Sequence, residues 1–257
     1  MKLSFRWYGD SDPVTLEYIR QIPGMEVIVS AIYDVPVGEI WGEDKIKALA
    51  EKVEAAGLKL DVIESVPVHE DIKLGKPSRD HYLANYCQNI RNLAKYGVKV
   101  ICYNFMPVFD WLRSDLDYKL ADNSSALIFK QETVDALNPY TSDLSLPGWD
   151  ASYTKDGLIA LLDEYKAVDA EKLWENFAYF LNAIMPTCDE VGMKMAIHPD
   201  DPPWPIFGLP RIITGADSYD RMISICPSLN NGFTVCTGSL GASPDNDLSA
   251  IIRKYGN

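Results

Sequence analysis

The chain has 257 residues, a formal net charge of −13 and a sequence pI near 4.6. Such an acidic chain argues against nucleic acid and anionic membranes as partners, whereas a local arginine or metal still permits an anionic small substrate. The five irregularly spaced cysteines, the absence of a signal-peptide core and the absence of a long apolar run predict a cytoplasmic protein with one domain over residues 1–257.

Strand-like and helix-like segments alternate along the chain. Short apolar runs rich in β-branched and aromatic residues predict strands at 3–8, 26–33, 58–67, 98–107, 194–199 and 232–238. Apolar residues at helical spacing predict helices over 43–56, 82–94 and 173–184, and further helices near 155–167 and 247–255. Gly57, Gly97 and Gly192 follow the first three helices, as expected where a helix ends and a strand begins.

This alternation predicts an α/β protein of the (β/α)8 TIM-barrel type with about six β/α units present. No Gly-x-Gly-x-x-Gly follows the first strand, which disfavours a nucleotide-binding sheet. Residues 108–170 are too long for an ordinary loop after the fourth strand, and we expect them to form an inserted cap or lid. Because a closed barrel needs eight strands, the chain is expected to be part of a longer protein.

A histidine and a cysteine follow the last two predicted strands. His198 ends the run Met195-Ala196-Ile197, and Cys236 has the equivalent place in 232–238. Catalytic groups of α/β barrels collect at the carboxyl ends of strands, and both side chains are common ligands of divalent metals. The residues therefore predict a metal site, although a cysteine taken alone is more often a small buried hydrophobe.

Polar side chains at other strand ends predict a site for an anionic substrate. Arg6 lies inside an apolar run and needs a carboxylate, either Glu64 or a ligand. The planar fork of Arg113 suits a carboxylate, and Asp110 or Asp115 is its alternative partner. The candidate substrate-binding residues are Arg6, Trp7, Tyr8, Asn104, Arg113 and Asp200.

The two remaining histidines have weaker signals. His69 follows the third strand and is expected either to touch substrate or to lie in a solvated loop. His81 is expected at a helix N-terminus that the hydroxyl of Ser78 can cap.

Several long motifs resemble the mannonate dehydratase family. They are FRWYG (5–9), IPGMEVIVSAIYDVPVGEIW (22–41), VIESVPVHEDIKLGKP (62–77), CYNFMPVFDW (102–111), LPGWDASY (146–153) and AIHPDDPPWPIFGLPRIITG (196–215). The resemblance implies a barrel enzyme of hexuronate breakdown that dehydrates D-mannonate to 2-dehydro-3-deoxy-D-gluconate with a divalent metal, Mn²⁺ or Fe²⁺.

The resemblance also implies roles for single residues. It makes His198 and Cys236 metal ligands, and it places the remaining ligands and the acid/base groups beyond Asn257, so the catalytic residues are unknown from this chain. Two other functions stay open: a xylose-isomerase-like sugar isomerase or epimerase, and a catalytically incomplete fragment that only binds. A homo-oligomer is plausible from base rates.

Overall fold

Six parallel strands form the main sheet in the computed structural model, which describes residues 1–140 and 154–256. Each strand overlaps one predicted apolar segment, and its neighbours follow chain order. The strands are β1 (Leu3–Arg6), β2 (Met25–Ser30), β3 (Lys59–Glu64), β4 (Val100–Tyr103), β7 (Lys194–Ile197) and β8 (Asn231–Phe233). A parallel sheet in chain order with helical crossovers is the arrangement of a partial β/α barrel.

The helices between these strands confirm the predicted amphipathic segments. The predicted ones are α2 (Glu43–Ala55), α4 (Arg79–Lys95), α6 (Lys155–Tyr165), α7 (Ala170–Val191) and α10 (Leu248–Tyr255), whereas α8 (Ala216–Ile225) was not predicted. Gly57, Gly97 and Gly192 have φ values of 75°, 85° and 70°, the left-handed backbone that glycine adopts without strain. The short helices are α1 (Leu16–Arg20), α3 (Glu70–Leu74), α5 (Gln131–Asp135) and α9 (Thr237–Leu240).

The start of α4 corrects one sequence expectation. Ser78 is the N-cap residue, but its hydroxyl makes no capping bond and donates instead to Asp71 Oδ2 at 2.6 Å. Ser78 already has helical backbone angles, with φ −68° and ψ −13°, whereas a capping side chain needs an extended N-cap residue. The serine therefore ties α4 to α3.

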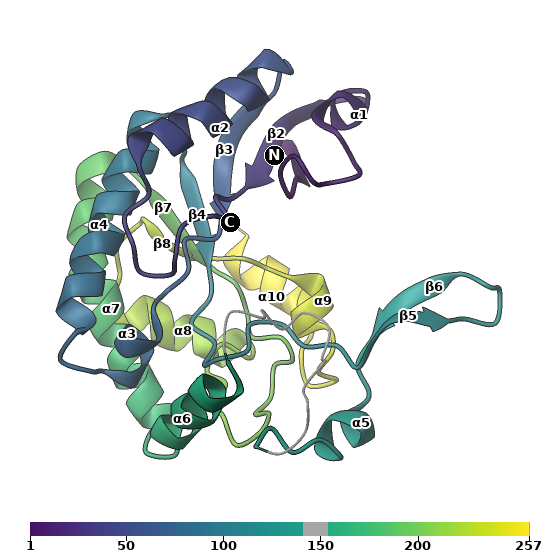
Figure 1. The fold of residues 1–257 in the computed structure, drawn as a ribbon, viewed down its shortest axis with the longest axis vertical. Coiled ribbons are helices and arrows are strands. Elements are labelled where there is room, and N and C mark those ends of the chain that lie inside the picture. Colours follow the sequence, from purple (N-terminus) through teal and green to yellow (C-terminus); the bar gives the residue numbers. More distant parts are fainter. Residues whose placement is uncertain (141–153, 257) are drawn as a thin grey trace. The chain divides into compact units, whose positions relative to one another are not determined.

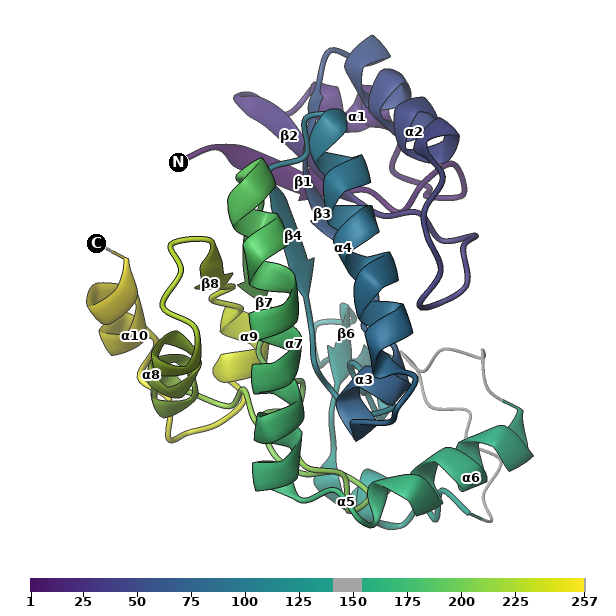
Figure 2. The ribbon, with the colours of Figure 1, turned by 90° about the vertical axis from the view of Figure 1, so that its left-hand side faces the viewer.

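The core of the parallel sheet lies under α4 and α7, which run side by side (Figure 1; Figure 2). Arg91 of α4 forms an ion pair with Glu190 of α7 at 2.8 Å. The ring of Phe180 lies 5.1 Å from that of Tyr86 on α4 and 5.6 Å from that of Tyr103 on β4. These fully buried aromatic contacts fix the helices on the sheet.

The insertion after β4 contains elements that the sequence pattern predicts only in part. Helix α6 is the one expected near 155–167, whereas the antiparallel hairpin of β5 (Asp115–Lys119) and β6 (Ser125–Ile128) was not expected. Its strands are short and mostly exposed, so they lack the continuous apolar run of the buried strands. The motif at 146–153 lies outside the described residues.

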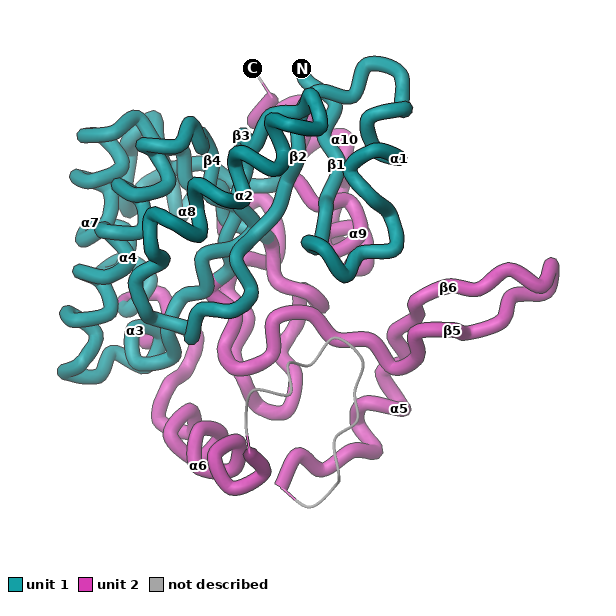
Figure 3. Tube along the Cα trace, turned by 45° about the horizontal axis from the view of Figure 1, so that its top comes forward, with its two compact units in different colours: residues 1–104, 176–198, 220–234 teal, residues 105–175, 199–219, 235–257 magenta. Residues whose placement is uncertain are grey.

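The chain divides into two compact units (Figure 3). The first comprises residues 1–104, 176–198 and 220–234 and holds the whole parallel sheet; the second comprises residues 105–175, 199–219 and 235–257 and holds the insertion. Among the described residues, no helix combines the length and the apolar character that a membrane crossing requires.

Candidate functional site

His198 stands directly after β7 at the carboxyl edge of the parallel sheet. Its backbone N–H donates to the carbonyl of Tyr103 at 2.6 Å, which continues the ladder between β7 and β4 by one residue. The pairing of β7 with β8 is also extended by one residue, because the Thr234 N–H donates to the carbonyl of Ile197 at 2.8 Å. The half-buried imidazole of His198 thus follows a rigid strand end, as the sequence predicts.

Arg6 ends β1 and is held by residues from two neighbouring strand ends. Its Nη1 lies 2.9 Å from Oε2 of Glu64, and its Nη2 donates to the hydroxyl of Tyr33 at 3.3 Å. The expected pairing with Glu64 is therefore confirmed. Within the described part of the chain, Nε of Arg6 is buried and has no hydrogen-bond partner. This guanidinium keeps unused donor capacity at the carboxyl edge of the sheet.

Tyr33 belongs to the same cluster and was not singled out by the sequence. Burial raises the pKa of its hydroxyl, and the nearby Arg6 charge offsets part of that shift. The ring centroid of Tyr8 lies 5.0 Å from the Arg6 guanidinium carbon. The cluster thus combines one cation, one carboxylate and two phenols.

Trp7 and Tyr8 occupy opposite environments although they are adjacent. Trp7 is only 4% exposed. Its backbone N–H donates to the carbonyl of Val29 at 2.9 Å, and its backbone carbonyl accepts from the Ser30 hydroxyl at 2.8 Å. Tyr8 is 59% exposed. Alternation of side chains along an extended segment explains the difference.

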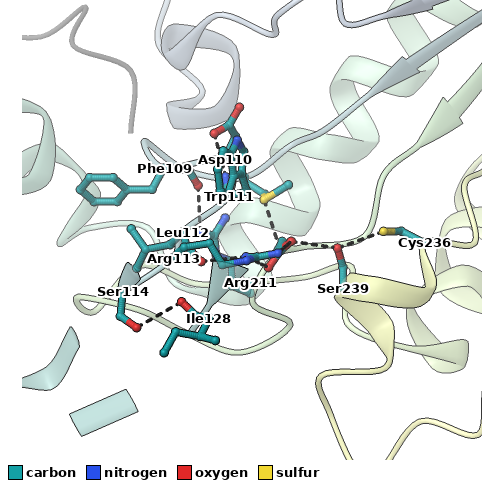
Figure 4. A network of polar contacts seen from close by, with 12 residues as sticks. Phe109, Asp110, Trp111, Leu112, Arg113, Ser114, Ile128, Arg211, Cys236 and Ser239 are labelled. Carbon is teal, nitrogen blue, oxygen red and sulfur yellow. Dashed lines mark hydrogen bonds and ion pairs between the residues drawn. The ribbon is translucent and has the colours of Figure 1, made fainter. Parts of the chain in front are cut away.

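In the second unit, Arg113 is engaged by a carboxylate distant in sequence. It donates from Nη1 and Nη2 to the two oxygens of Asp201 at 2.7 and 2.9 Å, the bidentate geometry of a strong pair (Figure 4). The alternative that pairs it with Asp110 or Asp115 is wrong, because the loop after β7 brings Asp201 to it instead.

Cys236 is the N-cap residue of α9 and is linked to this pair through Ser239. The Ser239 hydroxyl lies 3.1 Å from Oδ2 of Asp201 and 3.3 Å from Sγ of Cys236 (Figure 4). A hydroxyl has one proton, so both bonds form together only when the thiol donates to Ser239 and Ser239 donates to Asp201. If Cys236 becomes a thiolate, Ser239 is the donor positioned to stabilise it.

Asp200 has a structural task in the same loop. It is 1% exposed, and its Oδ2 accepts from the backbone N–H groups of Ile212 and Ile213 at 2.6 and 3.0 Å. The carboxylate therefore ties the two sides of the loop after β7 together.

Asn104 is half-buried and directly follows Tyr103 at the end of β4, as expected.

His69 has a structural role at the start of α3. His69 is the N-cap residue of α3: its Nδ1 accepts from the Asp71 N–H at 3.1 Å, and its ring stacks on Tyr82 with centroids 3.6 Å apart. Burial lowers its pKa, so the neutral ring that can accept this bond is favoured. No sequence signal distinguished this cap from a substrate contact.

The donor chemistry of His198 and Cys236 fits a divalent metal, since imidazole and thiolate both suit first-row ions. A catalytic site normally has about three protein ligands. In residues 1–140 and 154–256, no three His, Cys, Asp or Glu side chains gather in a way that would hold an ion. These two residues are thus ligand candidates and form no complete set.

Known proteins of one family match this chain over its whole length. The family model described as D-mannonate dehydratase (UxuA) matches residues 1–257. The chain is 58% identical to mannonate dehydratase 2 of Halalkalibacterium halodurans over 256 residues, which cover 100% of this chain and 74% of that protein. It is 59% identical to the mannonate dehydratase of Streptococcus uberis, with 99% of this chain and 73% of that protein covered.

Solved structures match this chain as well. The mannonate dehydratase from Streptococcus suis serotype 2 superposes with a TM-score of 0.91 at 49% identity, covering 99% of this chain and 69% of that one. A D-psicose 3-epimerase matches with a TM-score of 0.58 at 13% identity, covering 98% of this chain and 69% of that one, which is a likeness of fold alone. The chain belongs to the D-mannonate dehydratase family.

Proposed function

We propose that this chain dehydrates D-mannonate to 2-dehydro-3-deoxy-D-gluconate in hexuronate breakdown. The observation that carries the proposal is the 58% identity over the whole chain to a protein named mannonate dehydratase. The proposal includes completion of the six-stranded sheet to an eight-stranded barrel and a cytoplasmic location, which five free cysteines support.

We assign His198 and Cys236 to a divalent metal, Mn²⁺ or Fe²⁺, together with ligands from outside this pair. Such an ion, when bound, stabilises the negative charge that develops on a carboxylate whose α-proton is removed. The chain contributes the orientation of the ligands. His198 is held by the β-ladder, and Ser239 provides a hydroxyl at 3.3 Å from Sγ of Cys236 that can donate to a thiolate.

Arg6 is the best supported of the proposed substrate-binding residues. Its buried Nε donor, which has no hydrogen-bond partner among the described residues, suits a sugar-acid carboxylate. Tyr8 is exposed enough to contact a ligand beside Arg6. Trp7, Asn104, Arg113 and Asp200 complete the proposed set. Arg113 and Asp200 already hold Asp201 and the loop backbone, so we assign them to shaping the site as much as to contacting substrate.

Residues 108–170 are proposed to act as a cap that excludes water from the reaction. In sequence, the insertion begins shortly after β4, and its helix α6 buries Leu158, Leu162 and Tyr165. A cap of this kind would favour the proton transfers of dehydration over side reactions.

The first test is Mn²⁺-dependent formation of the 2-keto-3-deoxy acid from D-mannonate by this chain and by His198→Ala. We expect product from the parent and loss of turnover in the variant. Sugar epimerisation without the keto-deoxy acid would instead support the isomerase alternative.

Metal binding is tested independently of activity by titration with Co²⁺. A thiolate ligand gives an intense sulfur-to-cobalt absorption, which we expect in the parent and not in Cys236→Ser. Cys87→Ser is the matched control, because Cys87 is also half-buried but lies on α4. Equal absorption from parent and Cys236→Ser would remove Cys236 from the ligand set.

A further inference from the structure

The hydroxyl of Ser239 joins Cys236 to the ion pair of Arg113 with Asp201, and all four residues belong to the second unit (Figure 4). It lies 3.1 Å from Oδ2 of Asp201 and 3.3 Å from Sγ of Cys236, its two partners in the described part of the chain. Ser239 is only 1% exposed, so water does not replace a partner that is lost. The direction of each of these bonds therefore depends on the state of the other.

The short helix α9 explains why the serine meets the sulfur. Cys236 is its N-cap residue and has an extended backbone, with φ −80° and ψ 107°. Residues three positions apart lie on the same side of a helix, so Ser239 faces Cys236 across the first turn. An N-cap side chain usually accepts from the helix backbone, but that of Cys236 makes no capping bond. The helix therefore does not use the sulfur to hold its own end.

Ser239 has a single proton, and its use depends on the charge of the sulfur. While Cys236 is a thiol, the thiol donates to Oγ and the serine proton goes to Asp201. A metal-bound thiolate has no proton to donate, so the serine keeps this contact only by donating to the sulfur instead. Asp201 then gives up the bond from Ser239 but keeps both bonds from Arg113, at 2.7 and 2.9 Å. The ion pair thus lets the carboxylate release the serine proton without becoming unpaired.

We propose that Ser239 is a positioning residue for metal binding: its hydroxyl accepts from the Cys236 thiol in the metal-free chain and donates to the sulfur in the metal-loaded chain. This rests on the proposed function, which assigns Cys236 to the metal. In the exchange, the thiol proton leaves to solvent, and Ser239 turns its own proton from Asp201 to the sulfur. Arg113 favours the exchange, because a carboxylate that already accepts two charge-assisted bonds holds the serine proton less strongly than an unpaired one.

Infrared spectroscopy of the metal-free chain tests the first half of the proposal. A thiol that donates a hydrogen bond has a lowered S–H stretching frequency, and subtracting the spectrum of Cys236→Ser isolates the band of this residue. We expect the band to rise in frequency in Ser239→Ala. It should stay in place in the matched control Ser30→Ala, which removes a hydroxyl that is 0% exposed on β2. An unchanged band in Ser239→Ala would overturn the proposal.

Co²⁺ titration tests the second half. Removing the hydrogen-bond partner of a metal ligand typically weakens metal binding by 10–100-fold, so we expect Ser239→Ala to lose about tenfold or more. Its sulfur-to-cobalt absorption should move to longer wavelength, because a sulfur without this bond gives up electrons more readily. Ser239→Thr keeps the hydroxyl and should restore both properties. Parent-like affinity and absorption in a Ser239→Ala chain with a native circular dichroism spectrum would contradict the proposal.

A parent that lacks the sulfur-to-cobalt absorption altogether has a different meaning. It would refute the metal assignment of the proposed function and, with it, the metal-loaded half of this proposal. The infrared band would still decide whether the Cys236 thiol donates to Ser239, so the two failures are distinguishable.

Arg113 provides a test that a purely structural role would fail. Removing a positive charge strengthens the binding of a nearby cation by simple electrostatics. The proposal instead expects Arg113→Gln to weaken Co²⁺ binding, because Asp201 then competes more strongly for the Ser239 proton. In the Ser239→Ala background the same change should not weaken binding, since no proton is contested. Equal weakening in both backgrounds would show a general effect on the fold and would sink the proposed coupling.

Discussion

Replacing Asp200 by alanine tests whether this carboxylate is primarily a structural group of the loop after β7. Its Oδ2 accepts two backbone hydrogen bonds, from Ile212 at 2.6 Å and Ile213 at 3.0 Å, in a residue that is 1% exposed. Each buried N–H left without an acceptor costs about 1–3 kcal/mol. We therefore expect Asp200→Ala to lower the free energy of unfolding by about 2–6 kcal/mol.

Urea unfolding followed by tryptophan fluorescence measures this loss, and hydrogen exchange of the peptide around Ile212 shows whether the loop opens locally. Asp12→Ala is a matched control, because Asp12 also accepts two backbone bonds, from Tyr8 and Val14, both at 2.9 Å. Those bonds are exposed, so water replaces the carboxylate, and we expect a loss of about 1 kcal/mol or less. Equal losses for the two variants would refute the argument from burial.

Three further predictions concern ionisation, reactivity and pairing. Burial by itself raises the pKa of Asp61, but bonds from Lys2 and Lys99 lower it overall; its stabilisation is present above pH 4 and is lost as pH falls through the lowered pKa. Asp61→Asn should thus cost about 0.5–1 kcal/mol in urea unfolding at pH 7 and progressively less as the pH falls below 4. Burial raises the pKa of the Cys188 thiol to about 12, so this residue should resist alkylation at pH 8 until the chain unfolds, as mass spectrometry of labelled peptides would show. Arg113→Lys should break the two-bond geometry with Asp201 and lower the thermal midpoint by a few degrees, whereas unchanged melting would mean that a point charge is sufficient.

The strand positions could be predicted because each buried strand is a local apolar run. Residues such as Ile28 and Ile101 are completely buried, and their neighbours in sequence are apolar as well. The same reasoning locates His198, because a residue that follows a strand in a parallel sheet must lie at its carboxyl edge. The hairpin of β5 and β6 escaped prediction since its exposed strands have no such run.

The partners of the charged residues depended on tertiary structure. Nothing near Arg113 in sequence indicates Asp201, which lies 88 positions further on. Asp200 and Asp201 are adjacent and identical in the motif HPDD, yet Asp200 binds backbone amides and Asp201 binds an arginine. Local periodicity thus determined the strands, the helices, their glycine ends and the strand-end location of the candidate site. The pairing of its polar groups was decided only by how the loops fold, because a hydrogen bond depends on position and direction in space, which residue spacing does not record.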